Sequence, residues 1–422
     1  MSDETTEMSS SSKNESRDAE LSPNSGPNPG PNPGPNPGPN LGPGHCQKRG
    51  YTRRAFLTSA AGVTAGAVIG CGKNKEAKGK VSPPKPRSKG GGTADPTPRG
   101  DPRGAPRQRL ARATKKSKKT SASSGRGRVL RVHNAQAWDK NKNPALKPVE
   151  AMLDKLMKEL TGKSKVKDAW ASLFKSTDVV GLKPNTLGRD WISPSPALLL
   201  VIMAKLRDIG IPQSRVLVWD RSHLTSTKLY KALKKTQAQV KVQNGWGFDP
   251  KVYTLPSGRK AKFTKALLKA TAIIDIPVCK DHGLAGITGA LKNMSFGSVH
   301  NPWDHHPNGC NPGAPEIYNL SPIKDKVRLH IGDGFRLVYE GGPSGSRSRR
   351  YNVAASNLFA SLDPVALDRV MWHEVDRVRK SKGKAPLMKR GASKVGRPHH
   401  VIRADKMGLG ESTFSSIKYK KL

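Results

Sequence analysis

The sequence is short of aromatic residues and cysteines. Phe, Trp and Tyr together make up 5% of the 422 residues. Proteins that bind single-stranded nucleic acid stack the bases on aromatic side chains, and no nucleic-acid-binding module is recognisable here. The four cysteines include no Cys-x-x-Cys run, which excludes a ferredoxin-type iron–sulfur motif. We therefore expect neither a specific nucleic-acid partner nor a cluster held by cysteines alone.

Acidic residues are also scarce, since 32 Asp and Glu face 75 Lys and Arg for a net charge of +43. Residues 1–71 carry six of each sign, and residues 72–128 carry eighteen basic and three acidic residues, so +28 of the charge belongs to the remainder. Such a surplus attracts anionic lipid or an acidic envelope polymer. A highly charged, solvated surface without a specific partner is the alternative.

Large apolar side chains are rare before residue 129. Residues 1–71 contain a Gly-Pro-Asn-Pro repeat within a polar segment, and residues 72–128 are rich in Lys, Arg, Pro, Gly and Ser. These compositions cannot bury a core. We expect a disordered leader, a basic disordered linker over 72–128, and one domain over 129–422, which is long enough for a buried sheet.

One short segment of the leader resembles an export signal. Arg53 and Arg54 precede a moderately apolar run, 55–70, that is too short to span a bilayer and that ends at Cys71. The pattern predicts recognition by the twin-arginine export machinery, lipidation of Cys71, and a membrane-anchored protein facing the periplasm or the cell exterior. The long segment before the arginines leaves the start codon open. Because substrates of this pathway are often exported folded around a cofactor, a cofactor of unknown identity is favoured.

Beyond residue 128, short apolar strands alternate with amphipathic helices. This alternation predicts an α/β fold: a mostly parallel, doubly wound (Rossmann-like) sheet with helices on both faces. Asp363, directly before Pro364, is expected to cap a helix. Strands are expected at 129–132, 178–182, 215–219, 271–278, 327–331 and 353–360, and helices at 148–160, 166–174, 195–209, around Leu229, and at 364–378.

Four of the expected strands end in polar residues. These are Lys183 with Asn185, Asp220 with Ser222, Lys280 with His282, and Asp333. The carboxyl ends of parallel strands lie along one edge of a sheet, where ligands bind. We therefore expect these side chains to converge on one pocket, although ordinary loop chemistry also places polar residues at strand ends.

The stretch 274–293 contains the densest set of candidates. An apolar strand changes abruptly to Lys280, Asp281 and His282, and glycines then precede what is expected to be a helix N-terminus. Glycines permit tight turns, and a helix N-terminus attracts anions, so the stretch predicts an anion cradle. Lys280, His282 and Asp333 are the candidate catalytic residues, with His282 moving protons; the candidate substrate-binding residues are Lys183, Asn185, Asp220, Thr288, Lys292 and Asn293.

A metal is an alternative, because the segment 300–310 holds three histidines, Asp304 and Cys310. Imidazole and thiolate suit zinc and similar divalent metals, and the candidate ligands are His282, His305 and Cys310. If the leader is removed and Cys71 is lipidated, Cys279 and Cys310 remain. They could form a disulfide outside the cytoplasm, share a metal, or carry thiol redox chemistry.

Several of these segments resemble one family, the bacterial and archaeal domain of unknown function 362, over about 180–412. The resemblance implies an exported twin-arginine protein and supports the Lys280–His282 element. Some members carry a ferredoxin segment, which is missing here. The matching segments are Lys183-Pro184-Asn185, 280–283, 289–293, Asp333-Gly334, Gly342-Pro343, 361–368 and 408–410.

Together these features predict an exported, lipid-anchored α/β protein of undefined activity that binds a small anionic ligand, with or without a metal, at the carboxyl edge of its sheet. Two alternatives stay open. One is a non-catalytic basic scaffold lipoprotein that grips an envelope polyanion. The other is a redox protein that works through its thiols or a metal.

Overall fold

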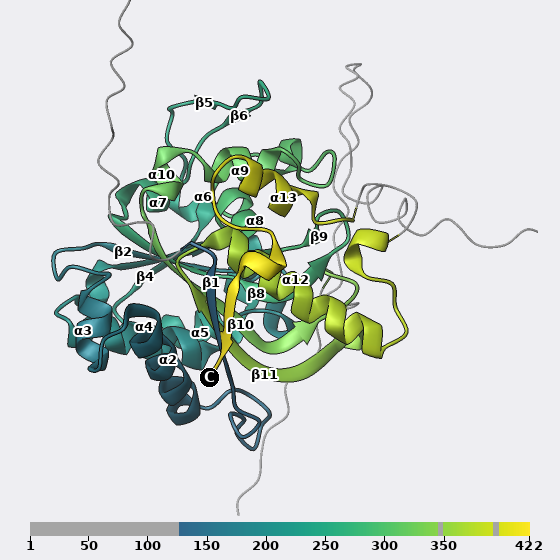
Figure 1. Ribbon diagram of the computed structural model, residues 1–422. Helices are drawn as coiled ribbons and strands as arrows, with labels where there is room; N and C mark the ends of the chain where they lie inside the picture. Colours follow the sequence, from purple (N-terminus) through teal and green to yellow (C-terminus); the bar gives the residue numbers. More distant parts are fainter. Residues whose placement is uncertain (1–125, 345–348, 391–395) are drawn as a thin grey trace, which may run out of the picture. The chain divides into compact units, whose positions relative to one another are not determined.

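A sheet of ten strands runs through the described part of the chain (Figure 1). The computed structural model describes residues 126–344, 349–390 and 396–422. Arg53, Arg54, Cys71 and most of the expected linker lie outside these residues. In spatial order the strands are β12 (Lys418–Lys421), β1 (Arg128–His133), β11 (Asn352–Ser361), β10 (Val327–Val338), β7 (Ala272–Ile276), β2 (Val180–Pro184), β3 (Val216–Asp220) and β4 (Gln239–Val242), while β8 (Val278–His282) pairs with β10 and with β9 (Gly286–Ile287).

The sheet is mostly parallel, as expected. Strands β4, β3, β2, β7 and β10 run parallel to their neighbours. The expectation fails at one side, where β11 is antiparallel to both β10 and β1. Strands β10 and β11 follow each other in the chain, separated by residues 339–351, and an antiparallel pair needs no long crossover. The fold is therefore α/β with a mixed edge.

Helices cover both faces of the sheet, and neighbouring strand residues serve different cores. Ile273 packs on one face and Ile274 on the other, because successive strand side chains point in opposite directions. One core contains α2 (Leu146–Thr161), α3 (Val166–Ala171), α4 (Pro196–Asp208) and α5 (Lys228–Leu233); the other contains α7 (Lys265–Lys269), α8 (Gly289–Phe296), α9 (Gly313–Tyr318), α12 (Pro364–Ser381) and α13 (His399–Lys406).

Most expected strands and helices are present within a few residues. The expected strand over 271–278 is instead interrupted at Pro277, and a second strand, β8, contains Lys280, Asp281 and His282. These three residues therefore belong to a buried strand, at its end, rather than to a loop tip. Elements that the sequence pattern did not predict include β4, β9, β12, β5 (Tyr253–Thr254), β6 (Lys260–Ala261), α6 (Gln243–Trp246), α7, α9, α10 (Ser321–Lys324) and α13.

Two local predictions concern the ends of the domain. Asp363 does cap α12, since its Oδ1 accepts hydrogen bonds from the backbone N–H groups of Val365 and Ala366 at 2.9 and 2.8 Å. Its Oδ2 accepts the N–H of Gly127 at 2.9 Å. Within the ranges that the structure covers, no helix is both long and apolar enough to cross a membrane.

Candidate functional site

The ends of β2 and β3 are joined by a buried ion pair. Lys183 Nζ donates to Asp220 Oδ1 at 2.7 Å, and Asp220 Oδ2 accepts the backbone N–H and the hydroxyl of Thr186. Burial alone would raise the pKa of Asp220, but the charge of Lys183 and these hydrogen bonds outweigh it, and the pKa is lowered. The two charges neutralise each other, so this pair supports the site rather than presenting a free charge to a ligand.

Asn293, on α8, connects this pair to the middle of the sheet. Its Oδ1 accepts hydrogen bonds from Lys183 Nζ at 3.0 Å and Asn185 Nδ2 at 3.1 Å, and its Nδ2 donates to Asp275 Oδ1 at 2.7 Å. Asp275 Oδ2 lies 2.9 Å from His330 Nδ1. Asn293 is thus fully engaged inside the protein and fixes the helix against β2 and β7.

Asp275 and His330 were not among the site residues predicted from the sequence. Asp275 is the single charged residue in the buried run Ala272–Ile276, and a charge that is buried must be paired or hydrogen-bonded. That exception in an apolar strand was the available signal. Burial raises the pKa of Asp275 in spite of the histidine and Asn293 contacts.

Lys280 extends the network toward a second group of side chains. Its Nζ donates to Asn185 Oδ1. Burial, reinforced by the nearby charges of Lys292 and Lys183 and opposed by that of Asp220, lowers the pKa of Lys280 to about 7. Near neutral pH this amine therefore exchanges between its charged and neutral forms.

Lys292 lies next in this group and has no anionic partner. Its side chain is buried, with Nζ 4.6 Å from the ring centroid of Phe296. Among the residues that the structure describes, none forms a hydrogen bond or an ion pair with Nζ. Burial and the charge of Arg221 lower its pKa. Near it, Thr288 Oγ1 and Arg221 Nη1 are buried polar atoms without a hydrogen-bond partner.

His282 ends β8 beside these cations. Its Nδ1 accepts the backbone N–H groups of Leu284 at 3.1 Å and Ala285 at 3.2 Å, which leaves the proton of the neutral ring on Nε2. Burial, together with the charge of Lys292, holds the pKa of His282 well below its usual value. The expected proton-moving residue is therefore a neutral hydrogen-bond donor in this structure.

Two further histidines face the same group. The His306 ring lies 6.1 Å from that of His282, between centroids, and 4.8 Å from that of Phe296. Burial and the charge of Lys292 lower the pKa values of His306 and His400 to about 3. We call the group formed by Arg221, Lys280, His282, Lys292, His306 and His400 the basic cluster.

The expected anion cradle at the helix N-terminus is wrong, because Asp368 already occupies that position. The backbone N–H groups of Ala290 and Leu291 donate to the Asp368 carboxylate. Gly289 has φ +57°, and a Cβ there would lie 2.1 Å from Asp368 Oδ1. Glycine is therefore required for the approach of an internal carboxylate, and a ligand would have to be held by side chains of the basic cluster.

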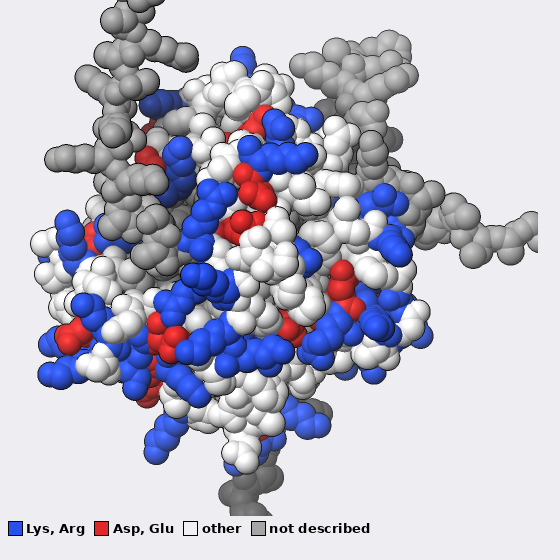
Figure 2. All heavy atoms as spheres, viewed as in Figure 1, with Lys and Arg blue, Asp and Glu red and all other residues white. Residues whose placement is uncertain are grey.

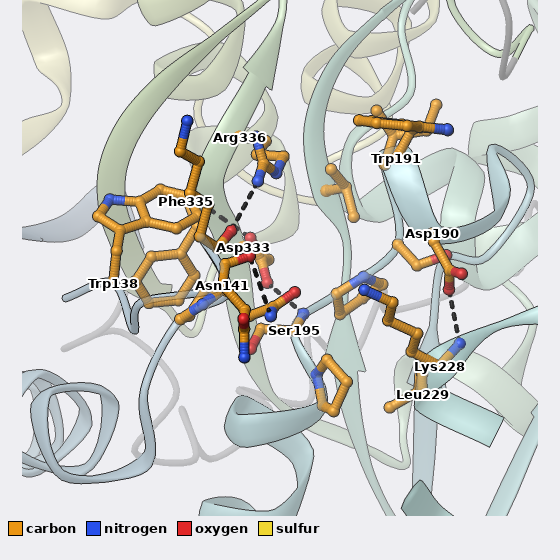
Figure 3. A pocket seen from close by; sticks show the side chains of 18 residues that line it. Trp138, Asn141, Asp190, Trp191, Ser195, Lys228, Leu229, Asp333, Phe335 and Arg336 are labelled. Carbon is orange, nitrogen blue, oxygen red and sulfur yellow. Dashed lines mark hydrogen bonds between the residues drawn. The ribbon is translucent and has the colours of Figure 1, made fainter. Parts of the chain in front are cut away.

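Asp333 does not join the basic cluster. It lies in β10 opposite Val278, and its carboxylate accepts the backbone N–H groups of Ser195 at 2.8 Å and Phe335 at 3.1 Å. Burial raises the pKa of Asp333 to about 6. It lines a separate cavity of about 460 Å³ (Figure 3). The expected catalytic set of Lys280, His282 and Asp333 is consequently split between two places.

The expected metal ligands do not form a set. Across residues 126–422, apart from the two short gaps, no group of three or more His, Cys, Asp or Glu side chains is placed to hold a metal ion. His282 Nδ1 is engaged by the backbone, and the His305 ring packs near Phe296, 6.1 Å between centroids. The arrangement of the described residues therefore gives no support to a metal site of His282, His305 and Cys310, which stays a prediction.

Cys279 and Cys310 are both buried free thiols, so the disulfide alternative is not formed. Burial raises the pKa of Cys279 well above its usual value and that of Cys310 to about 11. The thiolate is the nucleophilic and redox-active form. These two thiols therefore offer little support for a redox function.

The fold and the cluster define an α/β domain that buries a lysine without an anionic partner, Lys292, beside the carboxyl edge of its sheet. Residues 180–373 match the family model described as Domain of unknown function (DUF362). The resemblance seen in the sequence is confirmed for this range, while the segment 408–410 lies beyond it. No curated protein matches the chain.

One solved structure with partial similarity is the lactate racemase apoprotein from Thermoanaerobacterium thermosaccharolyticum. The identity is 15% and the TM-score is 0.32, over 42% of this chain and 48% of that one. The chain thus spans about half the length of that structure.

Proposed function

We propose that this protein binds a small anionic ligand in the basic cluster. The proposal rests on Lys292. This lysine is buried, and within the described residues no carboxylate or hydrogen-bond acceptor contacts its Nζ. A buried charge without a partner is strongly unfavourable. A bound anion would remove that cost, because it would neutralise the ammonium group.

The neighbours of Lys292 suit the same ligand. Lys280 gains charge when an anion approaches, and neutral His282 can donate from Nε2. Thr288 Oγ1 and Arg221 Nη1 are further buried groups without partners. Charge-assisted hydrogen bonds from such groups are stronger than neutral ones. The proposal assigns binding of an anion, and it assigns no reaction.

Anion binding is expected to take up a proton from solution when the pH is above about 7. The pKa of Lys280 is about 7 in the free protein, and a bound anion favours the charged amine. Below this pH Lys280 is already charged, so binding is strong without uptake. Above it the affinity falls with rising pH by up to about tenfold per unit.

Calorimetric titration with sulfate, which stays a dianion throughout this range, measures the effect when it is repeated in buffers of different ionisation enthalpy. Lys280→Met should abolish the proton uptake. Binding with no proton uptake at about pH 8 in the parent protein would contradict the assignment of Lys280 to the site.

Export and anchoring form a separate part of the proposal. The protein is delivered by the twin-arginine machinery and held by a lipid on Cys71, facing the periplasm or the cell exterior; Arg53, Arg54 and the apolar run before Cys71 support this. Replacing both arginines by lysine should retain the precursor in the cytoplasm, and Cys71→Ala should release the protein from the membrane fraction. Unchanged fractionation of both variants would refute it.

A non-catalytic scaffold on an envelope polyanion is the second candidate. The face seen in Figure 2 carries many Lys and Arg side chains and fewer Asp and Glu. The whole chain has a net charge of +43. Screening weakens contacts between exposed charges. Binding to heparin that disappears in about 0.5 M salt and survives Lys280→Met would favour the scaffold, whereas sulfate binding that is weakened in this variant favours the buried site.

A further inference from the structure

The cavity that contains Asp333 is a second site, distinct from the basic cluster. It has a volume of about 460 Å³, within the range of roughly 300–1,000 Å³ for small-molecule sites. It lies between β10, the loop 141–144, the segment 190–196 and the start of α5. None of the residues of the basic cluster lines it. Figure 3 shows its labelled side chains arranged around the open space.

The floor of the cavity carries unused hydrogen-bonding capacity. Ser195 is 6% exposed, and its Oγ has no partner. Ser195 donates its backbone N–H to Asp333, and each oxygen of the Asp333 carboxylate accepts one backbone N–H. A carboxylate oxygen has two acceptor positions, so one remains on each oxygen. A buried hydroxyl needs a hydrogen-bond partner, and a ligand that both donates and accepts can supply it here.

The walls add aromatic surface and amides. Trp138, Trp191 and Phe335 line the cavity together with Asn141 and Asn143. Trp191 is 40% exposed, which is unusual for so large an apolar side chain.

Trp138 is held in place. Its Nε1 donates to Ser356 Oγ at 2.8 Å, and the Arg336 guanidinium lies 5.0 Å from the Trp138 ring centroid. Trp191 contacts Arg349, which lies 4.5 Å from its ring. The Trp138 wall is therefore preorganised, whereas Trp191 is left accessible to a ligand.

We propose that this cavity binds a sugar, as a monosaccharide or disaccharide. A pyranose ring has apolar C–H faces and a girdle of hydroxyl groups that both donate and accept hydrogen bonds. The indole and phenyl groups match the apolar faces. Ser195, Asp333 and the asparagine amides match the hydroxyl groups. The exposed indole of Trp191 is the contact that faces an incoming ring.

Titration of the full chain with free sugars, followed by calorimetry, tests the assignment. The probes are D-glucose, D-galactose, D-mannose, N-acetyl-D-glucosamine, D-glucuronate, cellobiose and maltose. At least one is expected to bind saturably. Trp191→Ala should weaken that binding at least tenfold, and Ser195→Ala should weaken it severalfold, since the Ser195 hydroxyl caps no backbone group of α4.

Two controls separate this site from the basic cluster. Trp303 is also an exposed indole, 59% exposed, but it stacks on His306; Trp303→Ala and Lys292→Met should leave sugar binding unchanged. Failure of every sugar to bind overturns the proposal. So does binding that is insensitive to Trp191→Ala and Ser195→Ala, or that is lost in Lys292→Met. None of these outcomes bears on sulfate binding by the basic cluster.

Discussion

Replacement of Lys292 by methionine is expected to weaken sulfate binding by about 2–5 kcal/mol, or roughly thirtyfold to several thousandfold. Lys292 is the buried cation without a partner in the described residues, so an anion at this position depends on it. Methionine keeps much of the side-chain length and apolar contact with Phe296. Without ligand, the variant should be at least as stable as the parent, because an unpaired buried charge has been removed.

The measurement is the shift in the urea midpoint of the full chain as sulfate or oxalate is added, since a ligand that binds only the folded state stabilises it. Lys205 supplies the matched control. It is also a buried lysine, but its Nζ is paired with Glu150 at 2.6 Å and Asp154 at 3.0 Å. Lys205→Met should lower stability and leave the response to anions intact.

Two results would contradict the assignment of the anion site to Lys292. If Lys292→Met responds to sulfate and oxalate as the parent does, the basic cluster is not the anion site. If Lys205→Met loses the response as well, the effect of either substitution reflects the net charge of the protein and not a particular pocket.

Much of the framework of the site could be predicted because parallel strands run in the same direction, so that their carboxyl ends lie at the same edge of the sheet. The polar residues at the ends of the expected strands were predicted to meet at one edge, and Lys183, Asn185, Asp220 and Lys280 are connected through hydrogen bonds. Asn293 was also expected there, and it contacts Lys183 and Asn185. Strand order and polarity are enough to bring these positions together.

The position of Asp333 could not be predicted from the ends of the expected strands. The sequence pattern ended its strand near Ile331, whereas β10 continues to Val338 and pairs first with β7 and then with β8. Asp333 is therefore a residue within a strand, and it lies beside the interruption at Pro277. The face toward which such a residue points depends on local register, and a polar residue in the sequence does not reveal that register.

The distribution of charge could not be predicted either. Lys183 and Lys292 look equivalent in the sequence, yet only Lys183 has a buried carboxylate, contributed by a strand 37 residues away. Asp368 reaches the start of α8 from α12, which is 77 residues distant from Leu291. Arg221 directly follows β3, and His306 and His400 come from two further segments. Pairings of this kind follow from tertiary packing rather than from local pattern.

Because Lys183 is paired with a buried carboxylate and Lys292 is not, we expect Lys183→Met to lower the free energy of unfolding by about 3–5 kcal/mol at neutral pH. Lys183 is fully buried and Asp220 nearly so, with their charged atoms 2.7 Å apart. Removal of the lysine leaves a buried carboxylate without its cation. The double variant Lys183→Met/Asp220→Asn should recover part of the loss, because the asparagine oxygen can still accept a hydrogen bond from Thr186. Urea unfolding of the three proteins measures these differences.

If Lys183 acts through its charge, the loss of stability in Lys183→Met depends on pH. A packing defect would cause a loss that does not change with pH. In the parent, the pKa of Asp220 is lowered on folding, so its contribution to stability is present above the unfolded pKa of about 4 and is lost as the pH falls through the folded value. In Lys183→Met, burial without the cation should instead raise the folded pKa above the unfolded one. The variant should then gain stability relative to the parent as the pH is lowered from about 7 toward 4. A deficit that is equal at pH 7 and pH 5 would mean that Lys183 acts through its volume, and that its charge does not hold the end of β3 in place.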